Sequence, residues 1–102
     1  MSQATISASG EGCYAVEGEL DMKSVPQLWR SASGFFSTSA PSSLVFDLQA
    51  VTRSDSSGLA LLIEWMAQAR QNNQTISFRN LPAQMWEIAK VSDLADVIPL
   101  EK

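Results

Sequence analysis

The chain has 102 residues, with no histidine and a single cysteine, Cys13. Histidine is the commonest general base and a usual zinc ligand, so its absence excludes a serine–histidine triad. With one cysteine and no histidine, a structural zinc site is excluded as well. A single cysteine forms no intrachain disulfide, which is typical of a reducing compartment. These absences weigh against an enzyme.

Positive charge and long apolar runs are also scarce. Seven Lys and Arg residues against eleven Asp and Glu residues give a net charge of −4. No excess of positive charge is therefore available to attract nucleic-acid phosphates or anionic lipid. The longest apolar run, 59–69, is too short to span a bilayer and is interrupted by Glu64 and Gln68. No early segment resembles a signal peptide. We expect a cytoplasmic protein that binds no nucleic acid and does not insert into the membrane.

The chain does contain an alternation of strand and helix patterns within one domain, 1–102. Residues 1–12 are small and polar, which indicates a loosely ordered start or an edge strand through 5–7. Strands are predicted at 13–20, 43–51 and 75–79, and helices at 25–36, 57–71 and 83–91, with a short strand or turn after residue 94. We expect Gly18 to break the first of these strands, Ser24 to cap the first helix and Gly34 to end that helix early. This order predicts an α/β fold with a parallel or mixed sheet.

The strand at 43–51 is almost continuously apolar, apart from Asp47. Such a run is typical of a central parallel strand that is buried on both faces. The polar stretch RSDSSG, at 53–58, follows it and leads into a helix. In open α/β sheets, sites tend to form at this end of the strands.

Two interpretations of RSDSSG remain open. In the first it is a site: the amides of Ser57, Gly58 and Leu59 would be free to bind an anion, and Gly58 would let another group approach the backbone. In the second it is a helix cap, with Asp55 or Ser56 accepting a hydrogen bond from the first turn. The spacing alone favours the cap.

The helix at 57–71 carries more apolar residues than one core stripe needs. The expected stripe comprises Leu59, Leu62, Ile63 and Met66, with Ala69 or Arg70. Leu61 and Trp65 lie one turn apart and off that stripe, which suggests a contact surface. The alternative is that Trp65 is buried under a neighbouring helix.

Four charged side chains near the predicted strand ends allow more than one role. Asp21, Asp47 and Asp55 could together hold magnesium, but caps and turns are the favoured interpretation. The planar guanidinium of Arg53 could hold a phosphate or a partner carboxylate. As a solvated loop residue it would hold neither.

Three segments resemble the STAS domain family in sequence and separation: GELD at 18–21, LVFDLQAV at 44–51 and DSSGLALL at 55–62. The resemblance runs from about residue 13 to residue 99. It implies a single STAS domain, with a mixed sheet of about four strands flanked by about three to four helices. It also implies no catalysis, no cofactor and no metal.

The family includes the anti-sigma factor antagonists and the cytoplasmic tails of sulfate transporters. In antagonist members, the first serine or threonine after the aspartate of the motif takes a phosphate from a partner kinase. By position that residue is Ser56, with Asp55 before it and Asp21 facing the same loop. The resemblance thus implies one candidate function, an anti-sigma factor antagonist switched by phosphorylation of Ser56.

The chain is most similar to the STAS subunits of phospholipid-transport ABC complexes, which maintain outer-membrane lipid asymmetry. The similarity lies in VPQLW, in VTRSDSSGLALL with its arginine, and in LADVIP. Arg53 and Ser54 stand where many antagonists carry apolar residues. In the transport group the surface around the serine docks on the P-loop ATPase subunit, supports its activity and reaches the permease only indirectly. The implied protein is peripheral at the inner membrane, and its expected partner-binding residues are Arg53, Asp55, Ser56, Ser57, Gly58, Leu61 and Trp65.

Overall fold

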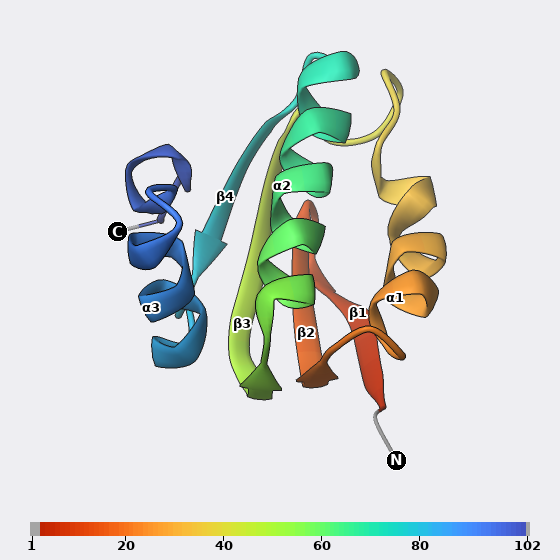
Figure 1. Ribbon diagram of the computed structural model, residues 1–102. Helices are drawn as coiled ribbons and strands as arrows, with labels where there is room; N and C mark the ends of the chain where they lie inside the picture. Colours follow the sequence, from red (N-terminus) through yellow and green to blue (C-terminus); the bar gives the residue numbers. More distant parts are fainter. Residues whose placement is uncertain (1–2, 102) are drawn as a thin grey trace.

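The computed structural model describes residues 3–101, which form a four-stranded sheet and three α-helices (Figure 1). The strands are β1 (Ala4–Gly10), β2 (Cys13–Leu20), β3 (Ser43–Ser54) and β4 (Thr75–Arg79). The helices are α1 (Val25–Ala32), α2 (Ser56–Gln71) and α3 (Ala83–Val91), with 3-10 turns at Ser33–Phe35 and Ala95–Val97. The predicted α/β class is confirmed. Within 3–101, none of the helices is long and apolar enough to cross a membrane.

The strands follow one another across the sheet in the order β1-β2-β3-β4. Strand β1 is antiparallel to β2, whereas β2, β3 and β4 are mutually parallel. The predicted mixed sheet is therefore confirmed. In the segment 1–12, Ala4–Gly10 forms an edge strand instead of a loose start, and residues 1–2 lie outside the described part.

Strand β2 does not end at Gly18, where a break was expected. Gly18 has a φ of 101°, and the register with β3 shifts next to it. A Cβ atom at this position would collide with the backbone carbonyl of Gln3, so glycine is needed for the close crossing. The irregularity is a bulge that carries β2 on to Leu20.

Side chains that point to the helices make up the core, and Val16, Leu44, Phe46, Leu48 and Phe78 are fully buried among them. The side chains that alternate with them, such as Ala15, Val45 and Asp47, are only half-buried. The helices therefore cover one face of the sheet. Strand β3 is central and parallel to both neighbours, as expected, but the expectation that both its faces are buried is wrong.

Helix α2 packs over the middle of the sheet, between α1 and α3 (Figure 1). Trp65 is 0% exposed, and its ring lies 4.5 Å, centroid to centroid, from that of Phe46 on β3. Leu61 is buried as well, whereas Ile63 and Met66 are half-buried. The prediction of a contact surface at Leu61 and Trp65 is therefore wrong. Helix α2 carries apolar residues around so much of its circumference that the sequence allows more than one choice of the face that packs against the sheet.

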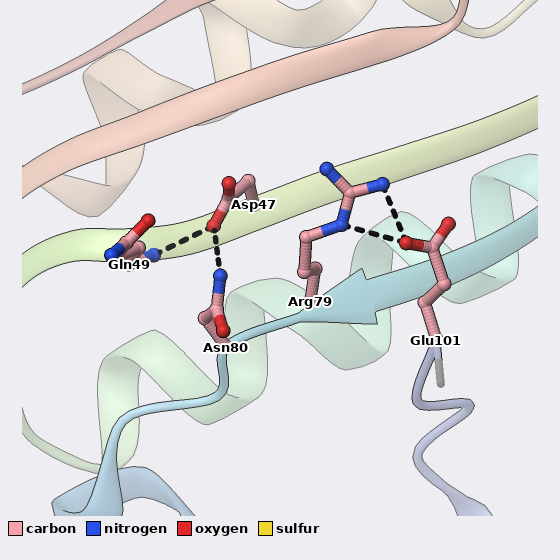
Figure 2. A network of polar contacts seen from close by, with 5 residues as sticks. All are labelled: Asp47, Gln49, Arg79, Asn80 and Glu101. Atoms are coloured by element: carbon pink, nitrogen blue, oxygen red, sulfur yellow. Dashed lines mark hydrogen bonds and ion pairs between the residues drawn. The ribbon is translucent and has the colours of Figure 1, made fainter.

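The segment after α3 extends the sheet beyond β4. The amide of Phe78 donates to the Pro99 carbonyl over 2.8 Å, and the amide of Glu101 donates to the Phe78 carbonyl over 2.9 Å. Arg79 donates from Nε to Glu101 Oε1 over 2.6 Å (Figure 2). This hydrogen bond and the carboxylate charge raise the pKa of Arg79. The short strand or turn predicted for this region is a 3-10 turn followed by a single β-bridge.

We expect Trp65→Ala to lower the free energy of unfolding by about 3–5 kcal/mol, because it leaves a cavity between α2 and β3. Urea denaturation followed by circular dichroism measures the loss. Trp86→Ala is the matched control, since Trp86 is half-buried on α3 and its loss should be smaller. Small and equal losses in the two variants would contradict the core position of Trp65.

Candidate functional site

The candidate site lies where β2 and β3 end side by side. Leu20 and Ser54 are partners across the two parallel strands, and the amide of Asp55 donates to the Leu20 carbonyl over 3.1 Å. Arg53 and Ser54, expected in a loop, belong to β3, and Ser56 already belongs to α2. The strand thus reaches the helix through Asp55 alone.

Asp55 caps helix α2. Its backbone is extended, with φ −105° and ψ −165°, and its Oδ1 accepts a hydrogen bond from the Ser57 amide over 2.8 Å. Its carbonyl also accepts from the Gly58 amide over 3.1 Å. Of the two predicted caps, Asp55 and Ser56, the structure selects Asp55. The site interpretation required the amides of Ser57 and Gly58 to be free for an anion. Both amides instead donate to Asp55.

Because Asp55 supplies the cap, the hydroxyl of Ser56 makes no hydrogen bond with another side chain or the backbone within residues 3–101. Its side chain is exposed at the first position of α2. Ser57, one residue further, is half-buried in the first turn. The Ser56 hydroxyl is therefore the more accessible of the two serine hydroxyls at this helix start.

Asp21 builds the turn that follows β2. Its Oδ1 accepts hydrogen bonds from the amides of Lys23, at 2.9 Å, and Ser24, at 3.0 Å. Ser24 Oγ donates to the Glu19 carbonyl over 2.6 Å and caps nothing in α1. Ser24 stands at the N-cap position of α1, as predicted, but no side-chain hydrogen bond caps this helix. Asp21 instead holds the turn before the helix, and its position beside Asp55 is as expected.

A polar pocket of about 320 Å³ lies between these two turns. It brings Asp21, Arg53 and Asp55 together, and Arg53 is exposed there. The pocket also contains Glu19 and Gln84, which sequence reasoning missed. Gln84 comes from the first turn of α3, and its Oε1 accepts from the Ser54 amide over 3.1 Å. The sequence held one usable signal for Gln84, because a helix that follows a third parallel strand begins at the same edge of the sheet.

Gly58 has a packing role and not a partner-binding one. It is buried, and a Cβ atom placed on it would lie 3.0 Å from Leu20 Cβ and still closer to Ser54 Oγ. The group that approaches its backbone is therefore the protein itself. Gly58, Leu61 and Trp65 were predicted to bind a partner, and all three are inside the domain.

The surface beside Ser56 has an apolar part that the sequence did not reveal. A groove of about 330 Å³ begins at Ser56 and continues between α2 and α3. Its apolar lining consists of Leu59, Ala60, Ile63, Ile88 and Leu94. The apolar centre expected at Leu61 and Trp65 is thus replaced by the neighbouring face of the same helix.

The three aspartates considered for magnesium lie in different elements and bond to different neighbours. Asp47 lies on β3, where its Oδ1 accepts from the Gln49 amide at 2.9 Å and from Asn80 Nδ2 at 3.1 Å (Figure 2). Asp21 and Asp55 form the turns described above. Within residues 3–101, no three His, Cys, Asp or Glu side chains are grouped so that they could hold a metal ion. The favoured interpretation of caps and turns is confirmed for Asp21 and Asp55, whereas Asp47 lies within a strand.

These features define an α/β domain in which a central parallel strand leads, through a capping aspartate, to an exposed serine at a helix start. The chain belongs to the STAS domain family: the family model described as "Mlab, STAS domain" matches residues 5–100. No curated protein matches the chain in sequence.

Solved structures share this fold. A chain of the Acinetobacter MlaFEDB complex in its ATP-bound Vtrans2 conformation has a TM-score of 0.75 and 23% identity, over 95% of this chain and 99% of that one. An anti-sigma factor antagonist from Mycobacterium paratuberculosis has a TM-score of 0.73 and 24% identity, over 95% and 84%. The anti-sigma factor antagonist SpoIIAA in its unphosphorylated form has a TM-score of 0.73 and 17% identity, over 97% of this chain and 88% of that one. At these identities the likeness shows the fold alone.

We expect Gly58→Ala to lower the free energy of unfolding by about 1–3 kcal/mol, because the new methyl group forces α2 away from Leu20 and Ser54. Thermal and urea unfolding measure the change. Gly34→Ala is the matched control, since a Cβ atom there meets nothing within 4 Å. An unchanged stability in Gly58→Ala would contradict the close packing at the helix start.

Proposed function

We propose that this chain is a non-enzymatic STAS subunit that binds and regulates the cytoplasmic ATPase of an ABC-type phospholipid transporter. Its work would serve the lipid asymmetry of the outer membrane. The P-loop ATPase is its direct partner and the permease an indirect one. The subunit is peripheral at the inner membrane, and it needs no cofactor.

The observation that carries this proposal is the match of residues 5–100 to the family model described as "Mlab, STAS domain". A chain of an MlaFEDB complex has the same fold over nearly its whole length. Both point to a domain that works inside a larger assembly. The regulatory role follows from the family, and the assignment of the partner is ours.

The surface around Ser56 has the chemistry of a docking site. Arg53 is exposed beside the polar pocket, and its planar guanidinium suits a carboxylate of the partner. Ser56 stands between this pocket and the apolar groove. An apolar centre with a polar rim is the usual anatomy of a protein interface.

A second function, an anti-sigma factor antagonist switched by phosphorylation of Ser56, has one observation in its favour. The Ser56 hydroxyl is exposed at a helix start, where a kinase could reach it. The Bacillus cell fate determinant SpoIIAA in its phosphorylated form has a TM-score of 0.69 and 18% identity to this chain, over 97% of this chain and 91% of that one. Against this function, Arg53 and Ser54 stand where many antagonists carry apolar residues.

We expect Ser56→Ala to change the free energy of unfolding by less than about 0.5 kcal/mol, because Asp55 provides the cap. Ser56→Glu and Arg53→Glu should each reduce co-purification of the ATPase while the domain stays folded. The measurements are urea denaturation and affinity purification from native cells under detergent. Ser39→Glu is the control, since Ser39 is exposed before the amino end of β3, at the other end of the strand.

The same purification separates the two functions. A P-loop ATPase together with a membrane permease supports the transporter subunit. A kinase-like anti-sigma factor, with phosphate found on Ser56 by mass spectrometry, supports the antagonist. Normal binding of the partner by Ser56→Glu would show that the docking site lies elsewhere.

A further inference from the structure

The groove between α2 and α3 is a surface that the fold leaves open. The two helices lie side by side (Figure 1). The groove runs along them from Ser56. Leu59 forms its buried floor, while Ile63 and Ile88 are half-buried. From Ser56 to Glu64 the helix rises about 12 Å, which is roughly two turns. The groove is therefore long enough for a short segment of another chain.

Apolar surface continues from the groove along α3. Val91 is 88% exposed, and it lies one turn beyond Ile88 on the same helix. Glu87, Ile88, Val91 and Ser92 line a second, shallower hollow there. An exposed valine adds nothing to the core. Together with the groove, with which the hollow shares Ile88 and Ser92, it forms one apolar surface of the kind that marks interaction sites.

The rim of this surface is acidic. Glu64 on α2 lines the groove, and Glu87 on α3 lines the hollow beside it. Lys90 is 3.0 Å from Glu87, so the one lysine of α3 is paired with a carboxylate of its own helix. The residues that line the groove and the hollow thus include two carboxylates and no Lys or Arg, and the whole chain has a net charge of −4.

This charge selects among the possible occupants. A second copy of the chain would bring one acidic rim against another, and like charges across an interface are unfavourable. Anionic lipid would be repelled for the same reason. An apolar segment with Lys or Arg at its edges would bury its apolar side chains in the groove and pair its positive charges with the carboxylates of the rim.

We propose that the α2–α3 groove receives a short partner segment that is apolar on one face and flanked by Lys or Arg. The inference rests on the proposed function, because the groove begins at Ser56 and is continuous with the docking site there. The polar pocket and the groove would then contact one partner through two chemically different surfaces. Ser56 lies at the junction.

Site-specific photo-crosslinking tests the occupant. Benzoylphenylalanine is placed at Val91 in the full chain, in native cells, and the crosslinked peptide is sequenced by mass spectrometry. The control position is Val97, which is 51% exposed and is not among the residues that line the groove or the hollow. The expected peptide contains apolar residues flanked by Lys or Arg. A crosslink to a second copy, to lipid or to an acidic segment overturns the inference, and so does a yield no higher than at Val97.

Two substitutions test the apolar and the charged part separately. Val91→Asp places a carboxylate in the apolar contact, and Glu64→Lys reverses a charge of the rim. Both residues are exposed, so the domain should remain folded. We expect each to weaken partner binding roughly tenfold or more. The matched controls are Val97→Asp and Glu11→Lys, in which the same changes are made at exposed positions outside the groove.

The outcomes distinguish the groove from the proposed function. If the ATPase co-purifies equally with the wild type and with both variants, the groove inference is wrong and the docking proposal around Ser56 stands. If a different protein crosslinks through a basic, apolar segment, and both variants weaken it, the groove inference stands and the assignment of the ATPase is wrong.

Discussion

The contact between the first turn of α2 and the ends of β2 and β3 governs the rest of the domain. Gly58 lies against Leu20 and Ser54 at a distance that leaves no room for a side chain. A helix is rigid over its length, so turning Gly58 inward also turns inward the residues three, four, seven and eleven positions later. These are Leu61, Leu62, Trp65 and Ala69, all of which are buried. Ser56, Ala60 and Glu64 lie on another face of the same helix and are exposed.

The same contact separates residues that hold the fold from residues that are available to a partner. Asp21 and Asp55 use their carboxylates on backbone amides of their own turns. Ser56 and Arg53 stand beside them with exposed side chains. The polar stretch 53–58 therefore contains residues with two different roles. Asp55 lies next to unpaired amides of the helix start and caps them, whereas Arg53 and Ser56 do not. The docking proposal depends on the residues left over.

Much of the architecture could be predicted from local patterns. The strands at 13–20 and 75–79 and the helix at 83–91 lie where alternation, glycine and proline place them. Asp21 and Asp55 do gather at the strand ends, as expected, because parallel strands put their carboxyl ends on one edge, whereas Asp47 lies within β3 and away from them. The cap at Asp55 was among the predicted alternatives, since its chemistry depends only on residues two positions apart. Gln84 was missed because it reaches the site from a helix thirty residues further along the chain.

By itself, the sequence determined the fold class, the order of the elements and the place of the motif at a helix start, because these depend on neighbouring residues and on periodicity. It also determined the family, through three segments at set separations. The tertiary structure decided which face of α2 is the core, so that Trp65 is buried and the groove beside Ser56 lies at the surface. Several stripes of that helix are apolar enough to be buried. The close approach of Gly58 to Leu20 and Ser54 selects the stripe that is buried. Leu20 is far from Gly58 in sequence, and it comes to lie beside Ser54 only when β2 and β3 pair.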